Sequence, residues 1–205
     1  MYSGGSYATV GGGHNNNTQG DAATVGGGQG NEAYGDYGTV GGGQSNKAYG
    51  YNTSVSGGQN NWAYGDNATL GGGFMNNARG LTSTIAGGEN ISVTGQATAV
   101  AGGSWITVTG AYAAAGGGQH NTVGNAYATI SGGGNNTASG YAAVIGGGGA
   151  WDVDFGGAPT PNQASGKWAT IGGGKGITVI ANYATVGGGQ WNTVSGENST
   201  VGGVR

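Results

Sequence analysis

The chain has 205 residues, of which 54 are glycine, two are proline and none is cysteine. So much glycine is typical of low-complexity or collagen-like chains, but the scarcity of proline and the lack of a Gly-X-Y period exclude collagen. Five basic and eight acidic residues give a net charge of -3. Without a basic stripe to neutralise phosphates we expect no nucleic-acid partner, and without cysteine there is no disulfide or thiol chemistry.

The sequence also predicts no insertion into a membrane. Its longest apolar runs are far shorter than the length that crosses a bilayer. The N-terminal stretch MYSGGSYATV lacks the basic start and apolar centre of a signal peptide. We therefore expect neither a membrane-spanning segment nor a secretion signal in this chain.

From the N-terminus onward, one 15-residue repeat organises the chain as a single repeat domain, residues 1–205. We call the residue before each run of glycines the anchor. The anchors are Val10, Val25, Val40, Val55, Leu70, Ile85, Val100, Ala115, Ile130, Ile145, Ile171, Val186 and Val201. Successive anchors are one repeat apart, except that the step from Ile145 to Ile171 is longer. The register thus resumes after an 11-residue insertion, which we place within about 149–165.

Each unit follows the approximate pattern x-x-A-T-[VIL]-G-G-G-x-x-N-x-A-x-G. Such a unit is too short for a helix pair or a propeller blade but fits one coil of a β-solenoid. Ala-Thr-Val reads as a short strand with alanine and the anchor inside and threonine outside, and the residue eight after the anchor is also apolar. We therefore predict an all-β β-roll or β-solenoid of about thirteen coils. The Asn six after the anchor and the Gly ten after it are predicted to form left-handed corners.

The triple glycine predicts close contact with another chain. A turn needs one or two glycines, whereas stacked rows of three leave a strip without side chains that another backbone can approach closely. A narrow coil lined by Ala and Val buries little apolar area, so association of several copies would supply the missing burial. The candidate glycines facing a neighbouring subunit are Gly12, Gly27, Gly42 and Gly72.

Aromatic residues indicate two further features. Tyr34, Tyr49 and Tyr64 occupy equivalent places in consecutive units and are predicted to stack as an external ladder. Tryptophan is too large for an Ala-lined coil, so Trp62, Trp105 and Trp191 are candidate exposed aromatics. Stacking on sugar rings and packing against another subunit are both open for them.

The sequence shows no catalytic constellation, so we expect no enzyme, no cofactor and no metal centre. His14 and His120 are assigned to an exposed polar row that is mostly glutamine. Gly172 to Gly176 lacks the spacing of a phosphate-binding loop. A polysaccharide depolymerase, the weakest alternative, would need carboxylates facing each other across a groove.

The insertion differs in composition from the coils. It contains both prolines and the cluster Trp151, Asp152, Asp154 and Phe155. Asp152 and Asp154 suit either a calcium site or solvated loop charges, and the scarcity of other acidic residues nearby favours the second. Loops extruded from a rigid scaffold often carry recognition residues, so this cluster is a candidate contact, against the alternative of an insertion without a role.

Two stretches resemble known families. NEAYG at 31–35 is similar to the left-handed parallel β-roll heads of trimeric autotransporter adhesins, and YATVGGGQWNTVSG at 183–196 resembles Gly-rich repeats of phage tail-fibre-like proteins. The resemblance covers almost the whole chain, although heptad stalk, β-barrel anchor and C-terminal chaperone have no counterpart here. It implies a homotrimer on a virion or cell surface, with other virion or surface-fibre subunits, and in some cases a host glycan, as partners.

The leading hypothesis is a structural and attachment protein, a rigid trimeric fibre, spike or decorating segment. The alternative is an ice-binding β-solenoid, because flat rows of threonine suit the ordering of water. One row runs through Thr9, Thr24, Thr39, Thr69, Thr84, Thr129, Thr170, Thr185 and Thr200. It provides a single Thr per coil and is broken at Ser54, Ala99, Ala114 and Val144.

Overall fold

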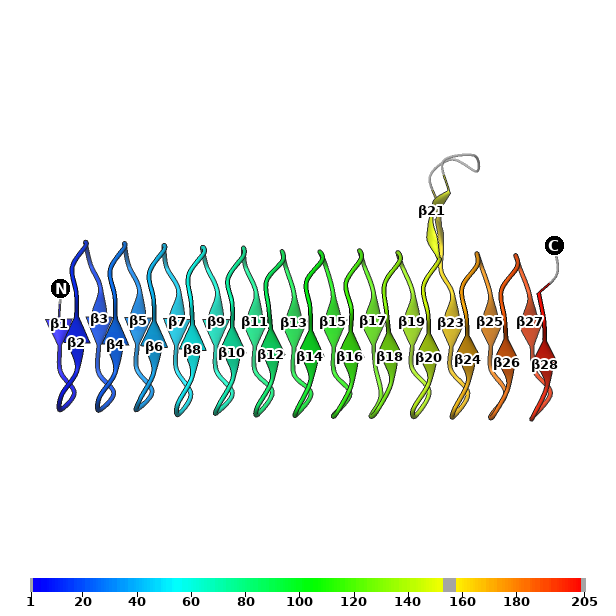
Figure 1. Cartoon of the computed structure of the whole chain (residues 1–205), viewed down its shortest axis with the longest axis horizontal. Helices are drawn as coiled ribbons and strands as arrows, with labels where there is room; N and C mark the ends of the chain where they lie inside the picture. Colours follow the sequence, from blue (N-terminus) through cyan, green and yellow to red (C-terminus); the bar gives the residue numbers. More distant parts are fainter. Residues whose placement is uncertain (1, 153–157, 204–205) are drawn as a thin grey trace. The chain divides into compact units, whose positions relative to one another are not determined.

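The computed structural model describes residues 2–152 and 158–203. Over these residues the chain is an all-β parallel solenoid, with one coil per 15 residues and no helix (Figure 1). The predicted fold class is confirmed. The chain divides into two compact units, Met1–Gly102 and Gly103–Arg205, and each is described by itself below.

Two parallel sheets build the first unit. The odd-numbered sheet consists of β1 (Tyr2–Ser3), β3 (Asn17–Thr18), β5 (Glu32–Ala33), β7 (Lys47–Ala48), β9 (Trp62–Ala63), β11 (Asn77–Ala78) and β13 (Ser92–Val93). The even-numbered sheet consists of β2 (Thr9–Val10), β4 (Thr24–Val25), β6 (Thr39–Val40), β8 (Ser54–Val55), β10 (Thr69–Leu70), β12 (Thr84–Ile85) and β14 (Ala99–Val100). Val25 pairs with Val10 on one side and Val40 on the other, so the anchors stack in one column as predicted.

The second unit repeats this arrangement. Its odd-numbered sheet consists of β15 (Thr107–Val108), β17 (Thr122–Val123), β19 (Thr137–Ala138), β23 (Gln163–Ala164), β25 (Thr178–Val179) and β27 (Thr193–Val194). Its even-numbered sheet consists of β16 (Ala114–Ala115), β18 (Thr129–Ile130), β20 (Val144–Ile145), β24 (Thr170–Ile171), β26 (Thr185–Val186) and β28 (Thr200–Val201). Ile145 pairs directly with Ile171, so the register passes across the insertion.

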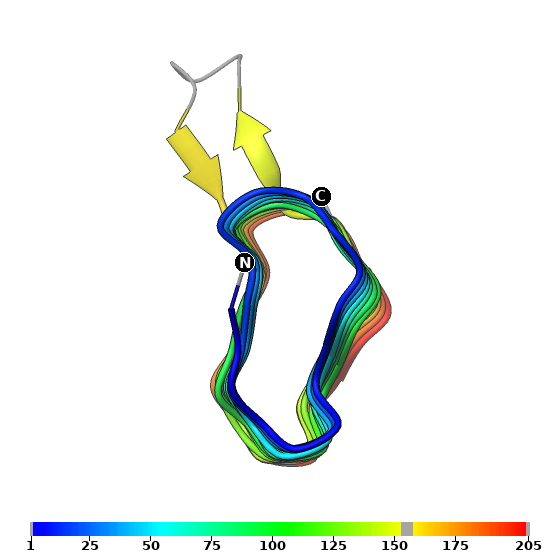
Figure 2. The same cartoon turned by 90° about the vertical axis from the view of Figure 1, so that its left-hand side faces the viewer.

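Each coil has two short strands joined by two corners (Figure 2). We call the segment after an even-numbered strand the glycine corner, as in residues 26–31 after β4. The segment after an odd-numbered strand is the turn corner, as in residues 34–38 after β5. The insertion leaves the solenoid at a glycine corner as the antiparallel hairpin β21 (Ala150–Asp152) and β22 (Ala158–Thr160), which projects from the coils (Figures 1 and 2).

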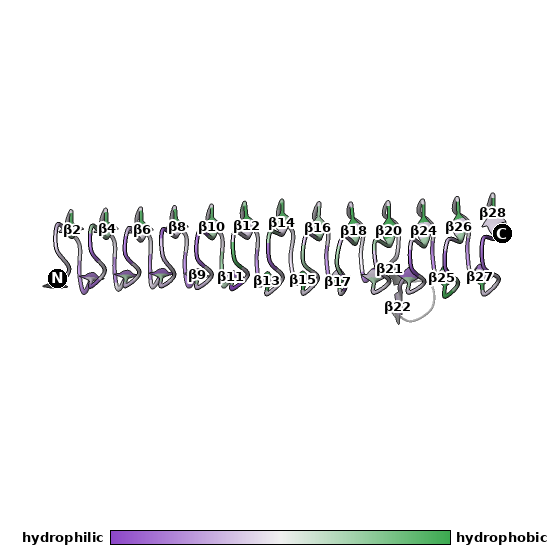
Figure 3. Cartoon of the chain, turned by 90° about the horizontal axis from the view of Figure 1, so that it is seen from below, coloured by the Kyte–Doolittle hydropathy of each residue, from purple (hydrophilic) through white to green (hydrophobic). Residues whose placement is uncertain are grey.

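The core is a column of small and branched side chains inside the coils. In one coil, Ala23, Val25, Asn31 and Ala33 are all fully buried, whereas Thr24 lies between two of them and faces outward. This confirms the predicted inward positions of alanine, anchor and the residue eight after it. The even-numbered strands are correspondingly coloured toward hydrophobic in Figure 3.

The predicted corner residues are wrong. The residues other than glycine that have left-handed φ precede the buried Asn, as at Asn15 and Ser45, or lie three before the anchor, as at Ala22 and Asn52. The buried Asn instead points inward. The Gly ten after the anchor instead lies where coils stack closely. A Cβ on Gly35 would overlap the carbonyl oxygen of Gly50, although Asn125 and Ala181 occupy this position in two other coils.

Candidate functional site

The three positions that follow the anchor in each glycine corner differ in what the fold requires of them. At the first, a Cβ on Gly26 would overlap the carbonyl oxygen of Gly41 in the next coil. Other coils nevertheless carry a small side chain there, as at Ser56 and Ala86. The first position therefore accommodates a methyl or hydroxymethyl group after a small local shift.

The third glycine is fixed by the fold of the chain itself. Gly28 has a φ of +87°, in the left-handed region, and a Cβ there would overlap the carbonyl oxygen of Gly43. It would also lie 2.8 Å from the Asn31 Nδ2. Both backbone conformation and space exclude a side chain, so this glycine needs no partner molecule to explain it.

At Gly27, the second glycine has no such explanation. A Cβ on Gly27 would have nothing within 4 Å, and its φ lies outside the left-handed region. Glycine nevertheless occupies this position in every coil: Gly12, Gly27, Gly42, Gly57, Gly72, Gly87, Gly102, Gly117, Gly132, Gly147, Gly173, Gly188 and Gly203. Of the candidate subunit-facing residues, Gly12, Gly27 and Gly42 share this open space, whereas Gly72 has a φ of +150° that itself favours glycine.

Backbone groups of the second glycines are also available for contacts. The carbonyl oxygen of Gly27 accepts a hydrogen bond from the Asn31 Nδ2 at 2.8 Å. Its N–H donates to no acceptor in the part of the chain that the structure describes, and the same holds for Gly42. The corner thus presents unpaired backbone N–H groups, as at Gly27 and Gly42, on a strip without side chains, which we call the glycine strip.

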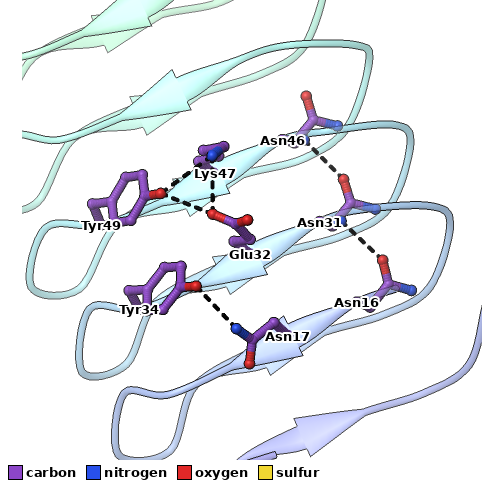
Figure 4. Close-up of polar contacts among 8 residues, drawn as sticks. All are labelled: Asn16, Asn17, Asn31, Glu32, Tyr34, Asn46, Lys47 and Tyr49. Carbon is purple, nitrogen blue, oxygen red and sulfur yellow. Dashed lines mark hydrogen bonds and ion pairs between the residues drawn. The ribbon is translucent and has the colours of Figure 1, made fainter. Parts of the chain in front are cut away.

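A ladder of buried asparagine amides holds the glycine strip in place (Figure 4). The Asn31 Nδ2 donates to the carbonyl oxygens of Gly27 at 2.8 Å and Gly43 at 2.9 Å. Its Oδ1 accepts the backbone N–H of Asn46 at 2.9 Å. In the first unit the ladder runs through Asn16, Asn31, Asn46, Asn61 and Asn76. Hydrogen bonds therefore hold the second glycine in place, although an added Cβ on Gly27 would meet no atom of the described chain within 4 Å.

The outer side of the odd-numbered sheet in the first unit carries a row of stacked tyrosines and one ion pair. The Tyr34, Tyr49 and Tyr64 rings stack with centroids 5.0 and 5.1 Å apart, which confirms the predicted ladder. The Lys47 Nζ lies 3.0 Å from the Glu32 Oε2, to which the Tyr49 hydroxyl also donates at 2.8 Å (Figure 4).

The same contacts shift the pKa values of Tyr49 and Lys47. Burial raises the pKa of Tyr49, and the hydrogen bond to Glu32 raises it further. Desolvation lowers the pKa of Lys47, but its hydrogen bonds to Glu32 and Tyr49, together with their charges, outweigh this and leave the pKa above the ordinary value. Both charges have their partners within the sheet, so the network stabilises the fold and leaves little binding capacity.

The candidate tryptophans differ in exposure. Trp105 is 53% exposed and Trp191 is 58% exposed, whereas Trp62 is half-buried beside Lys47. Trp105 stacks on His120 with centroids 5.8 Å apart. His14 does pair with Gln29 in the glutamine row, but the assignment of His120 to that row is wrong, because it follows Gln119 at a left-handed φ of 54°.

The hairpin carries the remaining candidate residues. Trp151 and Asp152 belong to β21, but their side chains, and the whole of Asp154 and Phe155, lie outside the described residues. Within residues 2–152 and 158–203, no three His, Cys, Asp or Glu side chains gather as a metal cluster would require. Nor does that part of the chain contain a helix long and apolar enough to cross a membrane.

Sequence reasoning did not predict that exposed aromatic residues form a row at the turn corners of the second unit. They are Tyr112, Tyr127, Tyr141, Trp168 and Tyr183. The 15-residue spacing from Tyr112 to Tyr127 and from Trp168 to Tyr183 was the signal that could have found them. The insertion lies between these two pairs in the sequence, so the spacing from one pair to the other is not a multiple of the repeat.

Comparisons with known proteins do not assign the chain to a family. No protein-family model matches the chain, and no curated protein matches it in sequence.

Proposed function

We propose that the chain is a structural and attachment protein, a rigid segment that assembles as a homotrimer on the outside of a virion or cell. The observation that carries this proposal is the second glycine of the repeat. It recurs in every coil, yet at Gly27 neither the backbone conformation nor the surrounding space excludes a side chain.

The free energy of folding shows what this recurrent glycine does not contribute. Glycine loses more backbone freedom on folding than any other residue, so an alanine at Gly27 would favour the folded chain. The stability of a single chain therefore does not explain the glycine. A contact with another molecule does, because a strip without side chains lets a second backbone approach and accept hydrogen bonds from the free N–H groups.

A further copy of the chain is the partner we propose for the glycine strip. Every copy carries the same strip, and closed cyclic assemblies bury equivalent surfaces on each subunit. The resemblance of the repeats to trimeric adhesin heads and tail-fibre shafts supports three copies. Other virion or surface-fibre subunits would then anchor the assembly.

The hairpin β21–β22 is the proposed contact to a receptor or a neighbouring subunit. It leaves a glycine corner and projects beyond the coils (Figure 2). Two such short strands are not stable alone in water, so a packing partner would stabilise them. Trp151, Asp152, Asp154 and Phe155 are the residues that we propose for this contact.

The glycine strip is tested by Gly27→Val, with Thr24→Val in the neighbouring strand as the matched control. We expect the wild-type assembly to have three times the chain mass of 19.6 kDa by light scattering. Gly27→Val should weaken assembly by roughly 1–3 kcal/mol per contact through overpacking, while its circular dichroism stays unchanged. Thr24→Val should assemble normally. A wild-type protein that is monomeric at micromolar concentration would refute the proposal.

Ice binding is the second candidate, and one observation favours it. In the second unit, the odd-numbered sheet carries a threonine row of its own, in which Thr107 pairs with Thr122 and Thr122 with Thr137. Nearer the C-terminus Thr178 pairs with Thr193 in this sheet and Thr185 with Thr200 in the other, so the single Thr per coil inferred from the sequence is wrong for those coils. We expect no thermal hysteresis from the purified protein. Hysteresis that disappears in Thr122→Leu would favour ice binding over attachment.

A further inference from the structure

Five large aromatic side chains line the turn corners of consecutive coils in the second unit. We call Tyr112, Tyr127, Tyr141, Trp168 and Tyr183 the aromatic edge. Their exposed fractions range from 37% to 54%. Adjacent rings along the edge have centroids 4.9 to 5.4 Å apart, so the five form one continuous row.

The scaffold does not require aromatic residues at these positions. The first unit fills the equivalent position, three before the anchor, with Ala22, Asn52, Asn67, Thr82 and Ala97 in five of its coils. Those coils have the same strands and the same register as the coils of the second unit. The aromatic edge therefore adds something that folding of the coil does not need.

The backbone at this position even disfavours bulky side chains. Tyr112, Tyr127, Trp168 and Tyr183 have left-handed φ values of 54° to 59°, a conformation that suits glycine and asparagine and disfavours other L residues. Large aromatic groups are thus held at strained positions and are left exposed to water. Strain and exposed apolar area together are typical of binding surfaces.

Tyr141 differs from the other rings in its orientation. Tyr112 stacks on Tyr127 at an interplanar angle of 10°, and Trp168 stacks on Tyr183 at 8°. Tyr141 lies between the two pairs and is turned by 65° from Tyr127 and 70° from Trp168. Neither of these neighbours lies parallel to Tyr141, so its ring faces are not covered by ring stacking within the edge.

The charges of the residues beside the aromatic edge limit which ligands it can bind. The turn-corner residues beside these rings are Ala111, Ala126, Ala142, Lys167 and Asn182, of which only Lys167 is charged. At the equivalent corners the first unit instead carries Asp21, Asp36 and Asp66. The aromatic edge is therefore nearly neutral and is unsuited to a strongly charged polymer.

We propose that the aromatic edge binds a neutral glycan chain. A sugar ring has an apolar C–H face that fits an aromatic face such as that of Tyr141, and a rim of hydroxyls that fits phenol O–H and indole N–H groups. Because coils repeat every ~4.8 Å, the edge offers a series of contacts to a polymer. The inference names the partner of the proposed attachment role and rests on that role, but it does not depend on the glycine strip.

Affinity electrophoresis in native gels tests this inference on the full chain. The probes are dextran, laminarin, hydroxyethyl cellulose and β-mannan, with polygalacturonate as the charged counterpart. We expect at least one neutral polysaccharide to retard the protein. The double variant Tyr141→Asn with Trp168→Asn should lower its affinity by roughly tenfold or more, because aromatic anchors dominate such contacts.

The variants are chosen so that binding and folding are separated. Asparagine already occupies the equivalent left-handed position at Asn52, Asn67 and Asn198, so the Trp168→Asn change suits the backbone. Tyr37→Asn, at the same position in the first unit, is the matched control and should leave retardation unchanged. Thermal unfolding and light scattering on the same samples report folding and assembly.

Three outcomes would overturn the inference. They are retardation by none of the neutral polysaccharides, retardation by polygalacturonate alone, and equal retardation of the wild type and the folded double variant. Co-sedimentation with phosphatidylcholine vesicles in the absence of glycan binding would likewise overturn it in favour of a lipid surface. Because assembly mass is measured separately, failure of glycan binding is distinguishable from failure of the trimer.

Discussion

Asn46→Asp is expected to destabilise the first unit by on the order of 1–3 kcal/mol or more, because a carboxylate replaces the buried amide that donates to two carbonyl oxygens. The Asn46 side chain is fully buried and donates from Nδ2 to the carbonyl oxygens of Gly42 and Gly58, each within 2.9 Å. A carboxylate has no donor to offer them, and its buried oxygen in place of the Nδ2 is left without a donor of its own, at a cost of about 1–3 kcal/mol and more for a charged group. Urea unfolding followed by circular dichroism measures the loss.

The pH dependence of this variant has a definite sign. Burial raises the pKa of the introduced carboxyl in the folded state above its unfolded value of about 3.9. Below about pH 4 the group is protonated in both states, so the deficit is smallest there, and it grows as the pH rises. A deficit that is independent of pH would contradict the burial of this side chain.

Asn46→Ile is the matched control, because isoleucine already occupies the equivalent buried position at Ile91, Ile106 and Ile177. It also removes the two donors, but it brings no charge and fills the core with apolar volume. We therefore expect a smaller loss than for Asn46→Asp. Equal losses of stability for the two variants would show that the introduced charge adds nothing to the loss of the amide.

Gly28→Ala is expected to lower stability by about 3 kcal/mol or more, whereas Gly27→Ala next to it should not lower it. The alanine at 28 has to adopt a left-handed φ and its Cβ overlaps the carbonyl oxygen of Gly43, two costs of about 1–3 kcal/mol each. At 27 the added methyl group meets nothing within 4 Å.

Thermal unfolding of the two variants under identical conditions checks this contrast. A loss of about 1 kcal/mol shifts the midpoint of a unit of about 100 residues by roughly 4–8 °C, so Gly28→Ala should unfold far below the wild type. The comparison is made at a dilution at which light scattering finds both proteins monomeric, and there Gly27→Ala should unfold near the wild type. Comparable losses in both would mean that the second glycine is also required by the fold.

The period of the sequence was sufficient to predict the coil. The anchors recur at one fixed spacing, and Val10, Val25 and Val40 do stack in one column. The Tyr34, Tyr49 and Tyr64 ladder followed from the same spacing. Equal spacing is enough for such features because a parallel solenoid places residues one period apart directly beside each other.

The roles of individual residues within the period could not be predicted in this way. Asn31 and Gly35 were both expected at left-handed corners, but Asn31 is buried with its amide bonded to two carbonyls, and Gly35 lies where coils approach. A propensity for turns is shared by asparagine and glycine, so it does not distinguish an inward side chain from a corner.

The sequence alone determined the period, the inward column and the outward ladder, because these depend only on which residues recur at equal distances along the chain. Tertiary structure decided which of three adjacent glycines the fold requires, because Gly27 and Gly28 differ only in the φ angle and in the distance to the next coil. It also decided that Tyr141 lies between Tyr127 and Trp168. That neighbourhood depends on how the chain closes across the hairpin, which brings Ile145 beside Ile171 in space although the whole insertion lies between them in sequence.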